Sequence, residues 1–317
     1  MRVTCDVLVL RADKEACLIA VANAPCSWGV LEFESKSASP GYEQVLDEIA
    51  ACGYAGTELG DWGFMPTEPS VLRERLDRRS LAMVGAFVTT RLADPRSYEA
   101  SVHTAVETAR LLSAVGDGGR PVIVLSDEPT ADPTRTGAAG RVEPALSLTG
   151  RQWDDAAKGV ERIAAAIRDE TGLRTVFHHH CASYVETPDE IDALMQRTDP
   201  SLVGLCLDSG HATYGGGSPI ELLSRHRART WHIHFKDCEP HIAERARRER
   251  LDYQTALRHG LFCELGRGSV DFPALLRELQ DSDYDGWIVV EQDVLPAMGS
   301  PGASATRNRQ FLRGIGL

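Results

Sequence analysis

The chain has 317 residues, of which 43% are apolar and 25% are charged, and its formal net charge at neutral pH is -12. This length fits one large globular domain or two smaller ones, and no linker-like stretch divides the chain. The acidic balance disfavours nucleic-acid binding, because proteins that grip a phosphate backbone normally present a basic face. The Arg-rich segment 244–250 is a local exception, but its arginines alternate with glutamates and predict a solvated helix.

The eight cysteines are scattered without a Cys-x-x-Cys pair, so we expect free thiols that pack as small apolar groups. The first residues fit neither a signal peptide nor a membrane span, and no apolar run has the length of a bilayer crossing. We therefore expect a cytoplasmic enzyme without a membrane partner. Residues 1–17 are expected to form an extension ahead of a catalytic domain at 18–317.

Apolar strand-like segments alternate with amphipathic helical segments along the whole chain, which is typical of a parallel sheet with helical crossovers. Strands are predicted at residues 18–23, 56–59, 83–88, 121–125, 174–178, 203–207, 230–234 and 287–291. Between the first two, residues 42–52 have helical periodicity and end at Gly53, which suits a left-handed cap.

Eight such units in about 300 residues predict an α/β protein with a single-domain (β/α)8 TIM barrel fold. A doubly wound sheet would carry a glycine-rich phosphate loop after its first strand, where this chain reads NAPCSWG at residues 23–29. The segment 127–150 is too long for an ordinary connection, and we interpret it as an active-site lid.

Four of the predicted strands lead into a side chain of a metal-binding type. These side chains are His178, Asp208, His234 and Glu291. The C-terminal ends of barrel strands meet at one rim, where the active sites of such barrels form. A mixed set of histidine and carboxylate ligands suits Mn, Co, Fe, Zn or Mg in different degrees. We therefore predict one mononuclear divalent metal site.

Several longer motifs surround these positions. They are SWGV at 27–30, GYAGTELG at 53–60, FHHH at 177–180, LDSGH at 207–211, HIHFKD at 232–237 and GWIVVE at 286–291. In these motifs the chain resembles the sugar-phosphate isomerase/epimerase-like barrels related to xylose isomerase and, among them, the inosose (2-keto-myo-inositol) dehydratases. The resemblance extends over nearly the whole chain from Ala20 onward.

The resemblance also implies a metal-ligand set and a reaction. In the epimerases of this superfamily the metal is held by Glu, Asp, His and Glu, and His178 stands at the first Glu position, with Asp208, His234 and Glu291 at the other three. Two glutamates there shuttle protons on opposite faces of one carbon, so a histidine in their place favours a reaction that removes one proton and expels a hydroxyl.

The implied activity is therefore metal-dependent dehydration of a keto-cyclitol such as scyllo-inosose, a lyase reaction of inositol catabolism, with Mn or Co as the first choice of metal and Mg, Fe or Zn as alternatives. Isomerisation or epimerisation of a sugar or keto-sugar on the same barrel is the alternative activity.

A nucleic-acid enzyme like the apurinic endonucleases would need a basic groove, which the acidic charge disfavours. The expected assembly is a homo-oligomer, a dimer or a tetramer.

Dehydration beside a ketone needs a base for the α-proton and an acid for the departing β-hydroxyl. Lys236 is one of four lysines in a chain with thirty arginines. It can stabilise the enolate oxygen, act as the base, or form a salt bridge to Asp237 or Asp208. His211 lies three residues beyond Asp208, where we expect it to reach a substrate hydroxyl.

Strand alternation divides the histidine triplet at 178–180. His180 shares the phase of His178 and is a candidate acid or base if the strand continues that far, whereas His179 is expected to point outward. Glu58 ends the second strand and is placed to bind polyol hydroxyls or to act as the base.

Four further residues are candidates for substrate binding. Trp28 and Trp62 follow the first two strands, where their rings can stack on the C–H face of a sugar or cyclitol or pack against another subunit. Asn23 ends the first strand. Arg267 stands between two glycines in a turn near the predicted mouth, although a lone arginine does not establish an anionic substrate.

Overall fold

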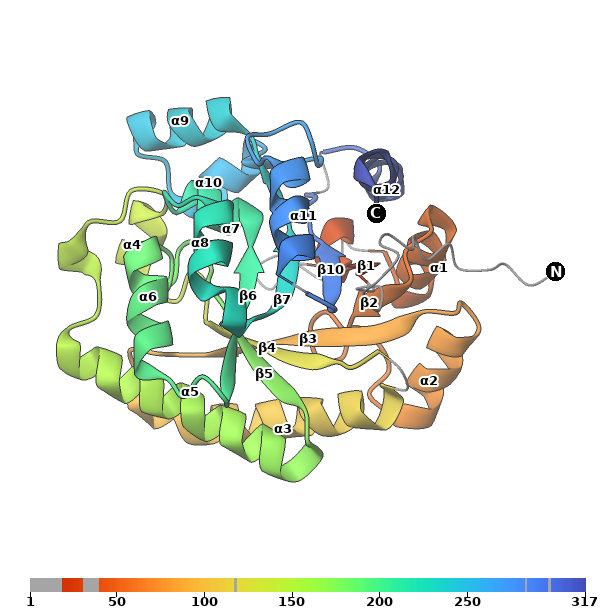
Figure 1. Ribbon diagram of the computed structural model, residues 1–317, viewed down its shortest axis with the longest axis horizontal. Helices are drawn as coiled ribbons and strands as arrows, with labels where there is room; N and C mark the ends of the chain where they lie inside the picture. Colours follow the sequence, from red (N-terminus) through yellow and green to blue (C-terminus); the bar gives the residue numbers. More distant parts are fainter. Residues whose placement is uncertain (1–18, 31–39, 117–118, 283, 296–297) are drawn as a thin grey trace.

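The structure is a computed structural model that describes residues 19–30, 40–116, 119–282, 284–295 and 298–317. Eight parallel strands close into a barrel in the order β1-β10-β7-β6-β5-β4-β3-β2, with helices around it (Figure 1). The barrel strands are β1 Ala20–Asn23, β2 Gly56–Glu58, β3 Ala82–Thr90, β4 Val122–Asp127, β5 Arg174–His178, β6 Val203–Asp208, β7 Thr230–Phe235 and β10 Trp287–Val290. Each of the eight predicted strands overlaps one of these, so the predicted TIM barrel is confirmed.

The helices form the outer layer of the fold. The longer ones are α1 Tyr42–Cys52, α2 Pro69–Asp77, α3 Tyr98–Val115, α5 Gly150–Thr171, α6 Pro188–Arg197, α8 Pro219–His226, α9 Pro240–Glu249, α11 Phe272–Asp281 and α12 Pro301–Ile315. The short ones are α4 Pro133–Ala138, α7 Ser209–Tyr214 and α10 Tyr253–Arg258, with 3-10 turns η1 Pro25–Trp28, η3 Pro95–Ser97, η4 Pro144–Leu146 and η5 Arg227–Arg229.

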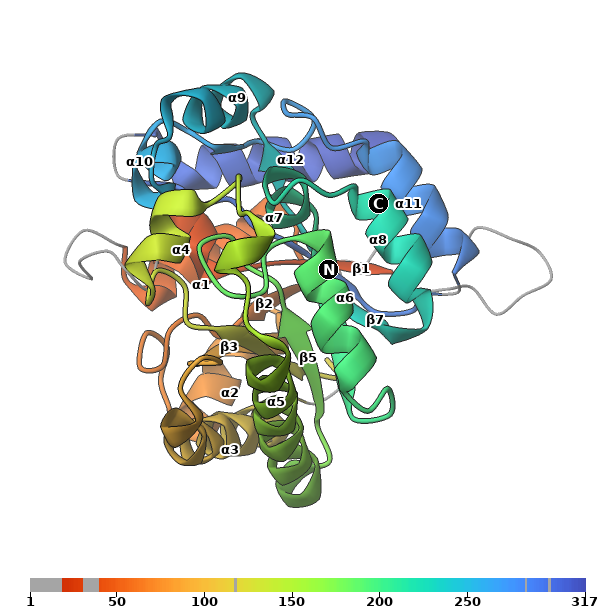
Figure 2. The ribbon, with the colours of Figure 1, turned by 90° about the vertical axis from the view of Figure 1, so that its left-hand side faces the viewer.

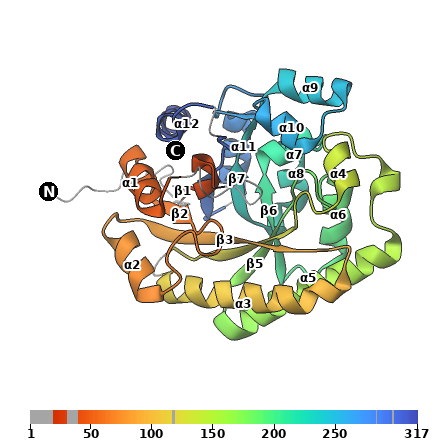
Figure 3. The same ribbon diagram turned by 180° about the vertical axis from the view of Figure 1, so that it is seen from behind.

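The first crossover helix has the predicted bounds, and Gly53 closes it with a φ of 86° that favours glycine. Helices α3 and α5 run side by side along one flank (Figure 2). Helix α12 packs beside α1, so the last helix of the chain meets the first (Figures 1 and 3).

Side chains alternate between the barrel interior and the surrounding helices. On β5, Phe177 belongs to the large apolar core under the helices, whereas Val176 packs with apolar residues of neighbouring strands inside the barrel. His178 follows in the inward phase. The strand register pairs Asp208 with His234. An apolar layer therefore fills the barrel, and polar side chains form the next layer toward the C-terminal ends of the strands.

The structure adds two features to the predicted barrel. Strand β8 Asp237–Cys238 pairs antiparallel with β9 Phe262–Cys263, and α9 and α10 lie between them in the chain. The segment 127–150 contains α4 and η4 rather than an irregular loop, and α4 contacts α10 at the same side of the molecule (Figures 1 and 3). The predicted helix at 244–250 belongs to α9. It is not wholly solvated, because the Arg247 guanidinium donates to the carbonyls of Gly140 and Tyr214.

Buried polar contacts hold the segment 127–150 on the loop that follows β5 and on the first turn of α6. Arg135 of α4 donates to both carboxylate oxygens of Glu190 at 2.8 Å and to the carbonyl of Ser183 at 2.8 Å. The Glu186 carboxylate accepts from the backbone N–H of Gly140, on the segment, at 2.6 Å. The segment is therefore docked by specific hydrogen bonds.

Replacing Arg135 with Met is expected to lower the free energy of unfolding by about 3–5 kcal/mol, because it leaves the buried Glu190 carboxylate without its partner. Chemical denaturation measures the loss, and limited proteolysis should cleave the segment 127–150 faster. Arg110→Met is the matched control, since Arg110 pairs with Glu170 in solvent and its loss should cost less than about 1 kcal/mol. Equal losses in the two variants would contradict a specific docking role for Arg135.

The six cysteines in the described residues are all free, as predicted. The expected extension at 1–17 lies outside the described residues. None of the helices in the described part of the chain combines the length and the apolarity that a membrane crossing needs.

Candidate metal centre and active site

The four predicted metal ligands come together at the C-terminal rim of the barrel. His178 ends β5, Asp208 ends β6, His234 is the last but one residue of β7, and Glu291 follows β10. These four strands are neighbours in the barrel. One nitrogen or oxygen atom from each residue lies within 4.8 Å of the corresponding atoms of the others. The side chains thus converge from one arc of the rim.

The polar atoms at the centre of this group fit a metal ion. Both ring nitrogens of His178, Nδ1 of His234 and Oδ2 of Asp208 are buried without hydrogen-bond partners among the described residues. His178 Nε2 lies 3.7 Å from Asp208 Oδ2, and His234 Nδ1 lies 3.4 Å from Glu291 Oε2. Buried polar atoms are costly to leave unpaired, and two imidazoles with two carboxylates form a common divalent-metal set.

Hydrogen bonds to the Glu58 carboxylate orient the histidines of β7. Glu58 Oε1 lies 3.0 Å from His234 Nε2 and 2.8 Å from His232 Nε2. Because a carboxylate accepts, His234 donates from Nε2, and its Nδ1 is the nitrogen that faces the other candidate ligands. Burial alone would raise the pKa of Glu58, but His234 and His232 lower it to about 2. Glu58, expected to be a base or a hydroxyl-binding residue, is therefore engaged in hydrogen bonds with His232 and the candidate ligand His234.

Exchange of Glu58 for Gln should weaken metal binding about 10-fold to 100-fold, because the amide no longer fixes the tautomer of His234 through a charged acceptor. The affinity is measured by titration with Mn²⁺, in which the electron paramagnetic resonance signal reports the concentration of the free ion. Glu48→Gln is the control, since Glu48 lies on α1, accepts from the Trp28 indole and belongs to none of the groups of metal-type side chains. An unchanged affinity in Glu58→Gln would refute the orienting role.

A cavity opens above the metal-binding residues. Its empty space, including the open mouth, is about 640 Å³. The described residues that line it are Ala24, Pro25, Cys26, Val30, Glu58, Gly60, Asp61, Phe87, Pro129, His178, His180, Lys236, Glu291 and Asp293. Pro129 belongs to the segment 127–150, so the predicted lid segment forms part of the wall. The lining combines apolar and polar side chains, which suits a small molecule with both C–H and hydroxyl surfaces.

Lys236 places a positive charge in the wall of this cavity. Its Nζ lies 3.1 Å from Asp293 Oδ1 and 3.2 Å from Glu291 Oε2. Burial alone would lower the pKa of Lys236, but Asp293, Glu291 and Asp208 hold it well above its usual value. A Cβ at Gly210 would lie 2.7 Å from Cγ of Lys236, so the glycine leaves room for the lysine stem. The lysine is a cation at neutral pH.

The expected salt bridge from Lys236 to Asp237 does not form. Asp237 instead fixes the turn that carries Arg267: its carboxylate accepts the backbone N–H groups of Cys238, Gly266, Gly268 and Val270. Arg267 itself pairs with Glu264 and is 67% exposed. It is not among the described residues that line the cavity, so the predicted place at the mouth is not observed.

His180 and His211 lie beside Lys236 with their ring centroids 3.9 Å apart. Strand β5 ends at His178, so the alternation argument does not reach His180, yet this residue lines the cavity. Its Nδ1 lies 2.6 Å from the carbonyl of Cys181, so Nδ1 donates and Nε2 keeps the lone pair. Burial lowers the pKa of His180 to about 3, which keeps the ring neutral.

His211 is fully buried and is not among the described residues that line the cavity, in contrast to the expectation that it reaches a substrate hydroxyl. Its Nδ1 accepts from the backbone N–H of Cys181, and its Nε2 lies 3.3 Å from Nζ of Lys236. His179 is also outside the ligand group, and its Nε2 accepts from the backbone N–H of Asp208. His211 therefore contacts the Lys236 ammonium and the Cys181 backbone, and His179 contacts the Asp208 backbone, instead of reaching the cavity.

The other proposed substrate-binding residues lie mostly away from the cavity. Trp28 is buried, and its indole N–H donates to Glu48 at 2.7 Å, so its ring belongs to the core beside α1. Asn23 is buried and caps the backbone N–H of Ala24. Neither is among the described residues that line the cavity. Trp62 is 39% exposed and directly follows the lining residues Gly60 and Asp61. Of the two tryptophans, it therefore remains the candidate for contact with the substrate ring.

The sequence analysis missed Asp293, which is buried, lines the cavity and pairs with Lys236. One signal was available. Asp293 stands two residues beyond Glu291, so continued alternation would have predicted that it faces the same side. Phe87, inside β3, and Cys26, in the 3-10 turn after β1, had no such signal, because an apolar side chain in either place is as consistent with core packing as with a cavity wall.

The comparisons with known proteins agree with this geometry. The sequence model of the xylose isomerase-like TIM barrel family matches residues 46–315. The chain belongs to this family. Within it, the inosose dehydratase of Geobacillus kaustophilus is 34% identical over 292 residues, which cover 92% of this chain and 93% of that protein. The inosose dehydratase of Lacticaseibacillus casei is 31% identical over 299 residues, covering 93% and 96%. The predicted resemblance to the xylose isomerase-like barrels and the inosose dehydratases is confirmed, and the chain is an enzyme similar to these dehydratases.

Solved structures of the family share the fold at low sequence identity. The IolI protein with a bound zinc atom aligns with a TM-score of 0.69 at 13% identity, over 94% of this chain and 98% of that chain. The probable 3-DHS dehydratase AsbF from Bacillus anthracis aligns with a TM-score of 0.67 at 13% identity, over 93% and 99%. These likenesses establish the barrel alone.

Proposed function

We propose that this protein is a metal-dependent dehydratase that removes water from a keto-cyclitol such as scyllo-inosose. The observation that carries the proposal is the group of unpartnered ligand atoms of His178, Asp208 and His234 beside a cavity whose wall holds a buried lysine cation. Identity of 34% to a protein named inosose dehydratase supports the same substrate class. Mn²⁺ or Co²⁺ is the proposed ion, bound by these three residues and Glu291.

A divalent ion bound there would polarise the ketone of the substrate and so acidify the α-carbon. We assign the proton transfers to the two cavity residues with suitable charge states. His180 is neutral, and its Nε2 lone pair takes the α-proton. Lys236 is charged and protonates the hydroxyl on the β-carbon, which leaves as water while the carbon–carbon double bond forms.

The roles of supporting residues follow from their contacts. Asp293 holds the Lys236 ammonium at the cavity wall. His211 packs behind the same ammonium and limits its movement. Glu58 fixes the imidazole of His234. Trp62 is retained as a rim residue for the apolar face of the ring, and a homo-oligomeric, cytoplasmic enzyme is part of the proposal.

Product analysis tests the proposal. The purified protein, with Mn²⁺ or Co²⁺ added in parallel samples, is incubated with scyllo-inosose, and the product is examined by mass spectrometry and ultraviolet absorption. We expect a product lighter by one water molecule that absorbs in the ultraviolet as an enone or dione. A product of unchanged mass would identify an isomerase or epimerase instead, and metal analysis of protein purified without chelators shows which ion the protein carries.

A further inference from the structure

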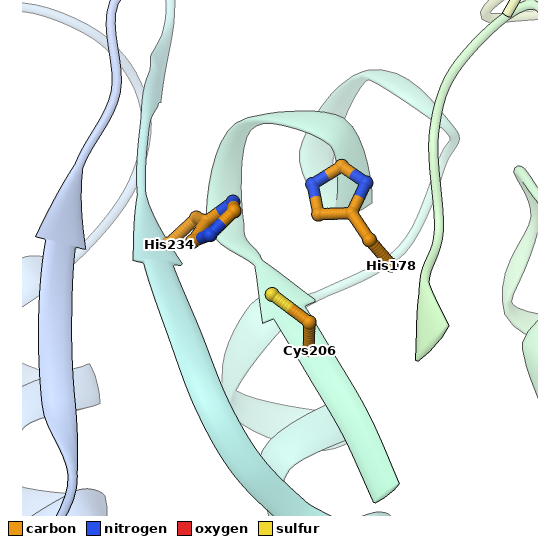
Figure 4. A group of neighbouring side chains, drawn as sticks. All are labelled: His178, Cys206 and His234. Atoms are coloured by element: carbon orange, nitrogen blue, oxygen red, sulfur yellow. The ribbon is translucent and has the colours of Figure 1, made fainter. Parts of the chain in front are cut away.

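A thiol lies next to the candidate metal centre, on the side toward the barrel interior. Cys206 is on β6, between β5, which carries His178, and β7, which carries His234, and its sulfur points between the two imidazole rings (Figure 4). Sγ of Cys206 and one ring nitrogen of each histidine lie within 4.8 Å of one another. Cys206 is fully buried, and it is not among the described residues that line the cavity.

The strand register explains why β6 offers two different ligands to the same pair of histidines. Cys206 is the Cα partner of His178, and Asp208 is the Cα partner of His234. Cys206 and Asp208 are two residues apart on one strand, so both side chains face the barrel interior, with Cys206 one step deeper. A cation bound to the two histidines can therefore take its third ligand either from the Asp208 oxygen near the rim or from the Cys206 sulfur below it.

The surroundings of Cys206 distinguish it from an ordinary packing cysteine. Its apolar neighbours inside the barrel are Val122, Val124 and Val176, so valine or alanine would suit the layer. The imidazole beside it is unpartnered: both ring nitrogens of His178, which is 2% exposed, have no hydrogen-bond partner among the described residues. Thiolate with imidazole favours thiophilic cations, whereas carboxylate favours Mg²⁺ and Mn²⁺.

We propose that His178, Cys206 and His234 form a second coordination position for thiophilic divalent cations such as Zn²⁺ and Cd²⁺. The inference rests on the proposed metal centre, because the two positions share both histidines. A cation held by Cys206 takes the histidines from the set completed by Asp208 and Glu291, so the two positions cannot be filled together. It also lies farther from the cavity, so Zn²⁺ or Cd²⁺ inhibits the enzyme that works with a harder ion.

Cobalt absorption spectroscopy on the full chain separates the two positions. Ligand-field bands in the visible report any bound Co²⁺, and an intense thiolate-to-cobalt band in the near ultraviolet reports a sulfur ligand. Co²⁺ accepts both oxygen and sulfur ligands, so we expect it to divide between the two positions and to show both bands in the wild type, with the ligand-field bands alone in Cys206→Ser. The affinity for Cd²⁺ should fall about 10-fold to 100-fold in this variant, with the affinity for Mn²⁺ retained.

Cys238→Ser is the matched control, because Cys238 is equally buried but belongs to β8 and to none of the described groups of metal-type side chains. It should keep the near-ultraviolet band. If the hydroxyl of Cys206→Ser prevents folding, Cys206→Ala gives the same comparison without a buried polar group.

The possible failures have different meanings. A sulfur band that survives in Cys206→Ser, or an affinity for Cd²⁺ that is unchanged in this variant, would overturn the second position and leave the proposed dehydratase intact. No cobalt binding at all would overturn both this proposal and the metal dependence of the proposed function. If the protein loaded with Mn²⁺ does not dehydrate inosose, while the cobalt form shows the sulfur band, the substrate assignment alone is rejected.

Discussion

Asp208→Asn is expected to abolish metal binding and to lower kcat/KM by about 10³-fold or more, which corresponds to roughly 4 kcal/mol of transition-state stabilisation. The two carboxylate oxygens have separate tasks. Oδ1 accepts the backbone N–H of His211 at 2.7 Å and caps α7, while Oδ2 is buried without a hydrogen-bond partner in the described part of the chain and faces His178. An asparagine retains the capping oxygen and replaces the ligand oxygen with an amide nitrogen.

The same substitution should leave the metal-free fold intact. Burial raises the pKa of Asp208, so its charge is unfavourable in the metal-free protein and its removal does not lower the stability at neutral pH. Metal at about 100 times its Kd should stabilise the wild type by about 2.7 kcal/mol and the variant not at all, as thermal unfolding would show. Asp271→Asn changes another capping aspartate, at the start of α11, and should affect neither property. A fully active Asp208→Asn enzyme would refute the site.

The barrel and the convergence of four metal-type side chains could be predicted because both depend on periodic patterns. His178, Asp208, His234 and Glu291 stand at the ends of strands whose apolar residues are unambiguous, and parallel strands in a closed barrel bring their C-terminal ends to one rim. The place of each of these side chains follows from its position on a strand. No long-range contact had to be known.

Residues on the loops could not be placed in this way. Trp28 lies in the 3-10 turn Pro25–Trp28, and Gly29 closes that turn with a φ of 78°, so the indole reaches Glu48 instead of the cavity. Arg267 lies in a turn fixed by Asp237, 30 residues earlier in the chain. In each case the direction of the side chain is set by a partner that is distant in the sequence, and strand or helix periodicity carries no information about it.

The partners of Lys236 show the same difference. From the sequence, the adjacent Asp237 and the neighbouring strand end Asp208 were the obvious counter-charges. The structure instead pairs the ammonium with Asp293 and Glu291, which arrive from the far end of the chain on β10 and the loop after it. The carboxylates of Asp293 and Glu291 hold the pKa of Lys236 well above its usual value, so the side chain is an ammonium at neutral pH. An ammonium can donate a proton, which favours Lys236 as the acid of the proposed dehydration over the role of base.

Lys236→Met is therefore expected to reduce kcat by about 10²-fold to 10⁴-fold, the usual contribution of a positioned acid, while the protein still binds its metal. Methionine keeps the length of the side chain and its packing against Gly210 but lacks the proton. The measurement pairs steady-state kinetics with metal content, because a loss of metal would point to a structural effect on Glu291 rather than to catalysis.

The charge balance needs its own control, since removal of the ammonium leaves Asp293 buried without its partner. Lys236→Met combined with Asp293→Asn removes both charges together and should restore stability to near that of the wild type. If the double variant is stable, holds metal and is still as slow as the single variant, the ammonium itself is required for the reaction. Recovery of activity in the double variant would instead show that the unpaired carboxylate caused the defect, and Lys236 would then be a positioning residue and not the acid.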